Sequence, residues 1–191
     1  MFGYRRARFI TVMGLVVVLV IITIVLIISH SSSQLLIQQK PLADYANNAS
    51  SQVAMLIDGP VNAQSEHNQV LITISNATTT IRVFQGYNDY VINSKSYPMT
   101  QAGYHVFLRS LEYAQFTKGT PSSALSQASG FCPTGDRYIF TFNANGQQKE
   151  RYWITNCNGD PHTFNGNLSL TTQLFESQVP DFTNMTLNLN L

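Results

Sequence analysis

The longest hydrophobic pattern in the chain is the uncharged segment Phe9–Ser29, FITVMGLVVVLVIITIVLIIS. At a rise of about 1.5 Å per residue, a helix of about 20 apolar residues crosses the roughly 30 Å hydrocarbon core of a bilayer. Arg5, Arg6 and Arg8 precede the segment, and the next basic residue is Lys40. Because positive charge stays on the cytoplasmic side, the pattern predicts a single-pass cell-membrane protein with a cytoplasmic N-terminus and an extracytoplasmic remainder.

A cleaved signal peptide is the alternative interpretation of this segment. Signal peptides have an apolar core of about 7–15 residues, followed by small residues in an A-x-A-like pattern. Here the run is longer and ends in SHSSSQLL, which favours a retained signal-anchor over cleavage after Ser31–Ser33. The predicted organisation is a cytoplasmic N-terminus at 1–8, a transmembrane helix at 9–29, a stalk at 30–51 and an extracytoplasmic domain at 52–191.

Short segments with a hydrophobic period of two follow the stalk. In the clearest of them, QVLITIS, the side chains of Val70, Ile72 and Ile74 share one face, as in a half-buried strand. Asx-rich and Gly-Pro turn sequences separate these segments. The predicted strands cover 52–57, 69–75, 80–84 and 90–96.

The period then changes to that of a helix. Thr100 is a suitable N-cap, and the apolar residues after it recur at helical spacing up to about Gln115. Three polar residues, His105, Arg109 and Glu112, lie on another face of this helix. They are either a site or a solvated face with an Arg109–Glu112 contact, and the spacing favours the solvated face.

The C-terminal third contains a hairpin, a helix and a tail. A long loop of small and polar residues at 118–130 leads into the hairpin, and loops of that length tend to be functional or mobile. After the hairpin, 167–179 is predicted to be a helix with an apolar stripe of Leu170, Leu174 and Phe175. Alternating apolar residues at 185–191 predict an edge strand.

The hairpin contains both cysteines of the chain, Cys132 and Cys157. Asn145-Gly146 is a strong hairpin turn signal, and it lies close to the midpoint between them. Folding the chain at this turn places the cysteines nearly opposite each other, within reach of the roughly 5.5 Å Cα separation of a disulfide. An even count in an oxidising compartment favours a disulfide, while a free structural pair and a catalytic thiol remain as alternatives.

Metal binding finds little support in the sequence. The two cysteines lie too far apart in the chain, without paired histidines, to match a zinc-ligand spacing. Polar residues gather after the second cysteine and suggest either a cation site or, as we favour, a polar turn: Asn156, Asn158, Asp160 and His162. We therefore expect no metal and no cofactor.

The order of elements predicts an α+β domain, in which one or two helices cover an antiparallel β-sheet. A mostly-β domain with the terminal helix at its edge is the second possibility. About 140 residues remain for this domain, which is enough for one hydrophobic core. Beyond the predicted anchor, eight Lys and Arg residues face ten Asp and Glu residues, without a basic stripe, so nucleic-acid binding is not expected.

Residues 69–158 resemble the subtilisin-inhibitor-like proteins, which are small secreted α+β domains. The resemblance lies in the order of sheet, helix and loop, and then in Cys132-Pro133-Thr134-Gly135 opening a hairpin that ends at Cys157. In that family a disulfide-stiffened loop occupies the cleft of a serine protease. The resemblance implies that Pro133, Thr134 and Gly135 form the presented loop. The family's other disulfide has no counterpart in this chain.

Three functions follow from these observations. The first is a membrane-anchored binding or envelope-structural domain without catalytic activity, because no known catalytic motif occurs. The second is a protease-inhibitor-like module, whose partner is an extracytoplasmic protease. The third is a cell-envelope hydrolase, although the sequence places no pair of acid–base residues together. The candidate acid–base residues are Asp58, Glu66, His105, Asp136, Glu150 and His162.

Overall fold

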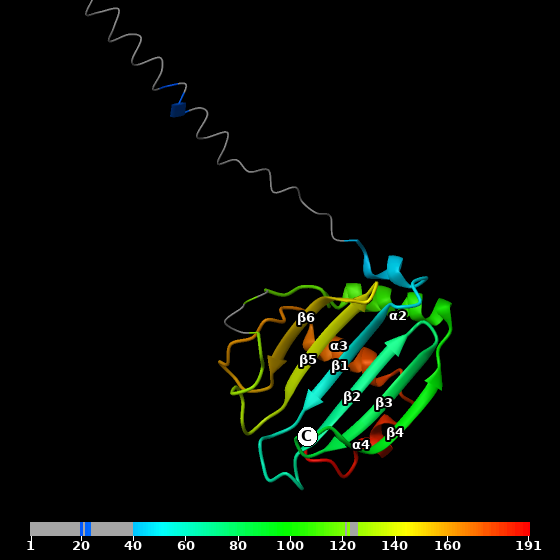
Figure 1. Cartoon of the computed structure of the whole chain (residues 1–191), viewed down its shortest axis with the longest axis vertical. Coiled ribbons are helices and arrows are strands. Elements are labelled where there is room, and N and C mark those ends of the chain that lie inside the picture. Colours follow the sequence, from blue (N-terminus) through cyan, green and yellow to red (C-terminus); the bar gives the residue numbers. More distant parts are fainter. Residues whose placement is uncertain (1–19, 21, 24–39, 121, 123–125) are drawn as a thin grey trace, which may run out of the picture. The chain divides into compact units, whose positions relative to one another are not determined.

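The computed structural model of the chain describes residues 20, 22–23, 40–120, 122 and 126–191 (Figure 1). The predicted anchor at 9–29 therefore lies almost entirely outside the described residues, and Arg5, Arg6 and Arg8 lie outside them as well. Among the residues that are described, no helix is both long and apolar enough to cross a membrane. The chain divides into two units, 1–39 and 40–191, and the second contains all the elements described below.

The unit at 40–191 is an α+β domain built on a six-stranded antiparallel sheet in the order β4-β3-β2-β1-β5-β6. Its strands are β1 (Gln52–Asp58), β2 (Asn68–Ser75), β3 (Thr78–Gln85), β4 (Tyr90–Pro98), β5 (Arg137–Ala144) and β6 (Gln147–Thr155). The four strands predicted at 52–57, 69–75, 80–84 and 90–96 are present, as is the hairpin turning at Asn145-Gly146. The central strand β1 brings the two hairpins together, because Met55 lies between Ile72 of β2 and Phe140 of β5.

The helices are η1 (Leu42–Tyr45), α2 (Gln101–Tyr113), α3 (Leu168–Glu176) and α4 (Phe182–Thr186). α2, α3 and α4 lie behind the sheet in Figure 1, on the face that holds the main core. The N-cap predicted for α2 is confirmed, since the Gly103 amide donates to Thr100 Oγ1 over 3.0 Å. The apolar stripe of α2 is fully buried as expected: Tyr104, Phe107, Leu108 and Leu111.

Aromatic residues from three elements fill the centre of this core. Phe116, Phe140 and Phe175 are all fully buried, with ring centroids 5.8–6.3 Å apart, and Phe107 packs edge-on against Phe175 at 5.4 Å. Aromatic pairs at such distances stabilise a core beyond their area burial. The hydrophobic positions that predicted the strands and helices thus meet in one cluster.

A second, smaller cluster lies on the opposite face of the sheet. There Trp153 of β6 is fully buried beneath Phe131, with ring centroids 5.1 Å apart, and Ala128 and Ile139 complete the cluster. The end of the predicted loop at 118–130 therefore covers the outer face of β5 and β6. Contacts with the buried Trp153 ring therefore hold Ala128 and Phe131 against this face of the sheet.

The C-terminal tail differs from its prediction. Residues 185–191 do not form an edge strand; instead α4 spans Phe182–Thr186, and no strand follows it. Met185 is buried in the main core, and Leu189 packs against the same core. A strand would place Leu187 on the same face as these two residues, but Leu187 is 73% exposed, as expected where a helix ends and the chain turns.

The second part of the predicted stalk belongs to the folded unit. Leu42, Ala43 and Ala46 are buried, and the Ala43 amide donates to Glu112 Oε1 of α2 over 3.1 Å. Ser51 is also fully buried, and its hydroxyl lies 2.9 Å from the Tyr104 hydroxyl. The sequence around these residues is mostly polar, so it predicted a stalk. The few apolar residues within it nevertheless pack η1 against α2.

Candidate functional site

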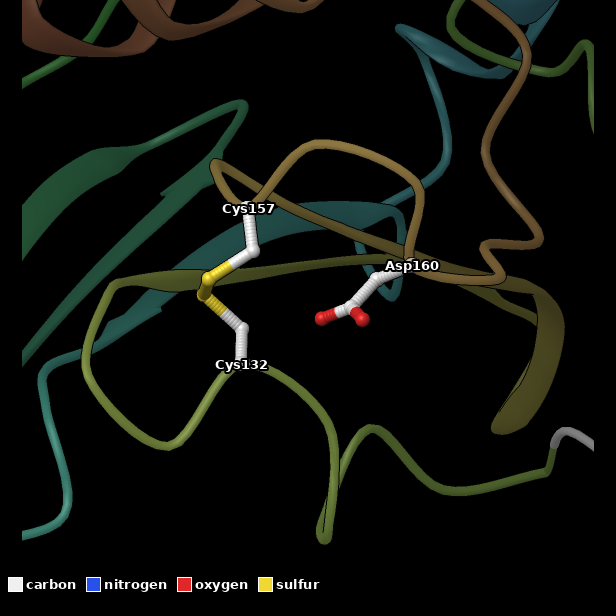
Figure 2. A group of neighbouring side chains, drawn as sticks. All are labelled: Cys132, Cys157 and Asp160. Atoms are coloured by element: carbon white, nitrogen blue, oxygen red, sulfur yellow. A yellow bond between two sulfur atoms is a disulfide. The ribbon is translucent and has the colours of Figure 1, made fainter.

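The predicted disulfide is present: Cys132 and Cys157 are bonded, with their Cα atoms 5.6 Å apart. It joins the segment before β5 to the segment after β6. Asp160 lies beside it in Figure 2, where one carboxylate oxygen and the two sulfur atoms lie within 4.8 Å of one another. Disulfide sulfurs are not thiolates, so this group of three does not supply a metal ligand set.

The loop after Cys132 is a tight turn. The Gly135 amide donates to the Cys132 carbonyl over 3.3 Å, which places Pro133 and Thr134 at the central, exposed positions of a β-turn. The Pro133 carbonyl in turn accepts from the Val61 amide over 2.7 Å. The loop is therefore bent back and bonded to the β1–β2 connection.

Gly135 is required by the close approach of Asn156. A Cβ at position 135 would lie 2.2 Å from Asn156 Oδ1 and 2.7 Å from Cys132 Sγ. The same Asn156 oxygen accepts from the Asp136 amide over 2.9 Å. Asn156 thus serves the polar turn that we favoured from the sequence.

The structure brings together a polar cluster that sequence spacing did not reveal, at the end of β1. Both oxygens of Asp58 are engaged: Arg137 Nε donates to Oδ2 over 2.8 Å, and Gln69 Nε2 donates to Oδ1 over 2.8 Å. Nε2 of His67 lies 3.1 Å from Asp58 Oδ1, and its Nδ1 lies 2.9 Å from the Pro60 carbonyl oxygen. A carbonyl only accepts, so Nδ1 carries a proton and donates to it.

This cluster is buried and internally bonded. The side chains of His67 and Arg137 are 0% and 4% exposed. Tyr87 stacks on the His67 ring at 4.1 Å, and Arg137 also donates to the Gly59 carbonyl. The groups are therefore arranged to hold the β1–β2 and β5 ends together, and of the described polar atoms of His67 only Nε2 lacks a hydrogen bond of its own. Only β1–β5 and β1–β2 pairing brings Asp58 beside Arg137 and Gln69, and the sequence alone did not give that pairing.

The remaining candidate acid–base residues are dispersed over the described domain. Glu66 lies in the β1–β2 connection, and His162 lies in the segment after β6. Asp136 precedes β5, where burial raises the pKa of its carboxyl. Glu150 of β6 accepts a hydrogen bond from the Tyr152 hydroxyl. Neither Glu66 nor Asp136 is paired with a histidine among the described ion pairs.

A hollow of the described domain runs between α2 and α3. We call it the α2–α3 groove. It has a volume of about 430 Å³ and is lined by His105, Val106, Arg109, Ser110, Tyr113, Leu170 and Leu174. A second hollow of about 430 Å³ continues it along the same two helices, with Val106, Ser110 and Leu174 in common.

The groove changes how the predicted trio on α2 is understood. His105 and Arg109 line the groove, whereas Glu112 faces the other way and accepts the hydrogen bond from Ala43. The expected Arg109–Glu112 contact is not among the described ion pairs. Val106 and Tyr113 also line the groove and are 63% and 86% exposed. They are apolar residues outside the buried stripe of α2, which is a sequence signal for an exposed apolar surface that our prediction did not use.

The comparisons with known proteins do not add a function. No model of a known protein family matches the chain. No curated protein matches it either. The functional argument therefore depends on the residues and geometry described above.

Proposed function

We propose that this chain is a single-pass cell-membrane protein whose extracytoplasmic domain binds a partner and has no catalytic activity. The uncharged segment 9–29 supports the anchor, and Arg5, Arg6 and Arg8 before it support a cytoplasmic N-terminus. The Cys132–Cys157 disulfide agrees with an oxidising, extracytoplasmic environment.

One observation supports a binding role over a catalytic one. The acid–base groups that the fold brings together, Asp58 and His67 with Arg137, are occupied by one another and by backbone groups. The α2–α3 groove lies elsewhere, and its described lining has one candidate acid–base residue, His105, with no carboxylate or thiol beside it. An enzyme is expected to combine its cavity and its titratable groups in one place.

The inhibitor-like module is less well supported by the loop geometry. A substrate-like loop has to lie extended along the protease, as a strand does. Pro133 and Thr134 instead occupy a β-turn, and the Pro133 carbonyl is bonded to Val61. Titration of subtilisin-like and trypsin-like proteases with the protein tests this alternative, and nanomolar inhibition lost in Thr134→Gly would support it over our proposal.

Membrane topology is tested with reporters fused to the full-length chain. An alkaline phosphatase fused after Leu191 is expected to be active, because that enzyme needs export, and the chain is expected to remain in the membrane after alkaline carbonate washing. Replacing Arg5, Arg6 and Arg8 by Glu is expected to reduce phosphatase activity by weakening the orientation signal. A chain released by carbonate, or an inactive C-terminal phosphatase, would refute the anchor and its orientation.

Catalysis is tested separately on the purified full-length chain. Peptidase, esterase and glycosidase substrates are expected to give no turnover above buffer. The informative control is Asp58→Asn, which removes the most highly bonded carboxylate described. Turnover by the wild type that falls in Asp58→Asn or His67→Gln, while both variants keep a native melting transition, would replace the binding proposal by the envelope-hydrolase alternative.

A further inference from the structure

The α2–α3 groove has an apolar floor that is accessible from outside the domain. Val106 and Tyr113 are exposed on α2, and Leu170 and Leu174 of α3 are only half-buried. Exposed apolar residues are unremarkable singly, but a contiguous apolar hollow marks an interaction surface. Ser110, the polar residue at its centre, already donates its hydroxyl to the Val106 carbonyl.

The charge along the groove has one sign. Of its described lining residues, Arg109 is a permanent cation, and His105 lies one turn before it on α2. Both are exposed, and neither forms an ion pair with a described residue. The nearest carboxylate on the same helix, Glu112, is turned toward Ala43 and is engaged there. A ligand on this floor therefore meets the Arg109 guanidinium without a compensating acid from a described lining residue.

The shape favours a helix as the ligand. Four of the α2 residues that line the two hollows recur every three or four positions along one face: Ala102, Val106, Arg109 and Tyr113. On α3 and just beyond it, Leu170, Leu174 and Gln178 recur every four. At the rise of an α-helix the α2 row is about 16 Å long, which is the length of about three turns of a third helix.

We infer that the α2–α3 groove binds an acidic amphipathic helix of a partner protein, an inference that rests on the proposed binding function. The apolar stripe of the partner helix covers Val106, Leu170 and Leu174, and Asp or Glu residues beside the stripe face Arg109 and His105. This is recognition of a helix in a groove, in which apolar anchors supply affinity and charges select the partner.

Two other ligands fit the groove less well. A small anionic amphiphile, such as a fatty acid, needs a cavity that encloses most of its surface, whereas exposed Val106 and Tyr113 lie along an open groove. An anionic membrane surface is recognised by clusters of four or more Lys or Arg residues, and the groove has one arginine and one histidine. Both ligands are nevertheless distinguishable outcomes of the experiment below.

The test uses the purified full-length chain and two displayed peptide libraries. In the first, Leu is fixed at helical spacing in peptides of about 16 residues, and the flanking positions are randomised over acidic, basic and neutral residues. In the second, Leu is fixed at alternate positions, as in a strand. Vesicles of phosphatidylcholine with or without phosphatidylglycerol, and oleate alone, are measured in parallel.

Two variants and two matched controls identify the groove. Val106→Glu is expected to weaken binding of the selected helices by more than about 100-fold, because it puts a carboxylate against an apolar stripe and offsets the charge of Arg109 at i,i+3. Arg109→Glu is expected to weaken binding by about tenfold and to change the selected flanks from acidic to basic. The controls Val61→Glu and Arg82→Glu alter equally accessible residues outside the groove and are expected to have no effect.

The inference is supported if the helical library yields acidic binders that are lost in Val106→Glu and reversed in Arg109→Glu. It is overturned if the selected peptides are basic or come only from the alternating library, if binding is insensitive to Val106→Glu, or if no peptide binds. Binding of phosphatidylglycerol vesicles or oleate that Val106→Glu abolishes, without helix binders, would assign the groove to a lipid instead. These results are independent of membrane topology and turnover, so failure here and failure of the proposed function are distinguishable.

Discussion

The two edge strands of the sheet, β6 and β4, differ sharply in how far the rest of the domain covers them. At one edge, β6 is covered on its outer side: Trp153 accepts at its carbonyl from the Phe164 amide over 3.0 Å, and its own amide donates to Thr163 Oγ1 over 2.9 Å. The Cys132–Cys157 disulfide joins the ends of the β5–β6 hairpin. At the other edge, β4 is exposed along nearly its whole length.

Few side chains of the exposed edge strand β4 contact the rest of the domain. Tyr90, Val91 and Ile92 are 66%, 43% and 45% exposed. Lys95 and Tyr97 donate to the Asp181 carboxylate, and a bulge interrupts pairing with β3 near Val91. A lysine and a bulge are two devices that discourage an edge strand from pairing with another chain. The comparison suggests that stability is concentrated at the β5–β6 edge, while β4 relies on its ladder with β3.

The largest expected effect is at the covered edge. Trp153→Ala removes the fully buried ring that Phe131, Ala128 and Ile139 surround. Because a large aromatic leaves a cavity when it is truncated, we expect the free energy of unfolding to fall by about 3–5 kcal/mol, measured by urea denaturation. A loss below about 1 kcal/mol would show that the outer cluster contributes little and that the two edges are more alike than they look.

The disulfide comes next. Cys132 and Cys157 are 25 residues apart in sequence, and opening a loop of that size is expected to cost about 3.5 kcal/mol through the unfolded state. Thermal melting of the wild type with and without reductant, beside the Cys132→Ser/Cys157→Ser double variant, measures this cost. Equal melting temperatures under oxidising and reducing conditions would contradict the prediction.

Two carboxyls near the C-terminus, Glu176 and Asp181, are also expected to respond oppositely to pH. Burial raises the pKa of the Glu176 carboxyl, so its ionisation destabilises the fold as pH rises through that pKa. Hydrogen bonds from Lys95, then from Tyr97, lower the pKa of Asp181, so its contribution is present at neutral pH and lost as pH falls through the folded-state pKa.

Substituting these acids tests the difference directly. At pH 7, Glu176→Gln is expected to raise the melting temperature, and Asp181→Asn is expected to lower it slightly, since an exposed ion pair contributes little. The Glu176→Gln difference should shrink first as the pH falls through the raised pKa of Glu176, and the Asp181→Asn difference only at lower pH, because the pKa of Asp181 is lowered. Shifts of the same sign at pH 7, or shifts that persist in acid, would be inconsistent with these titrations.

The smallest expected effect is at the exposed edge. Ile92→Ala removes a partly exposed side chain from β4 and is expected to change the free energy of unfolding by no more than about 0.5 kcal/mol. The measurement is the same urea denaturation used for Trp153→Ala. A loss approaching that of Trp153→Ala would mean that β4 is covered in the folded protein by something other than solvent.

Local signals in the sequence predicted most of the secondary structure. Alternation of Val70, Ile72 and Ile74 predicted β2, and Thr100 before a stripe of apolar residues predicted the start of α2. The tail was the exception, because Met185 and Leu189 fit a short helix as readily as a strand when only a few residues are available. Periodicity reports which residues are apolar, and in short segments it does not decide between two periods.

The candidate site was less accessible to the sequence. His105 and Arg109 were assigned to a solvated face, which is correct for α2 alone, but α3 lies beside them and converts that face into one side of the groove. The Asp58–Arg137 pair was missed for a similar reason, since the partners are 79 positions apart and meet only through strand pairing. No local pattern contains either contact.

The sequence by itself determined the extents of the strands and of α2, the Asn145-Gly146 turn and the disulfide that this turn makes possible. Each depends on residues close together in the chain, where spacing and side-chain type decide the outcome. The tertiary structure alone decided that β1 lies between β2 and β5, that one edge is covered and the other open, and that a cationic apolar groove runs between α2 and α3. These features arise from contacts between distant segments, which follow from how the apolar faces pack together.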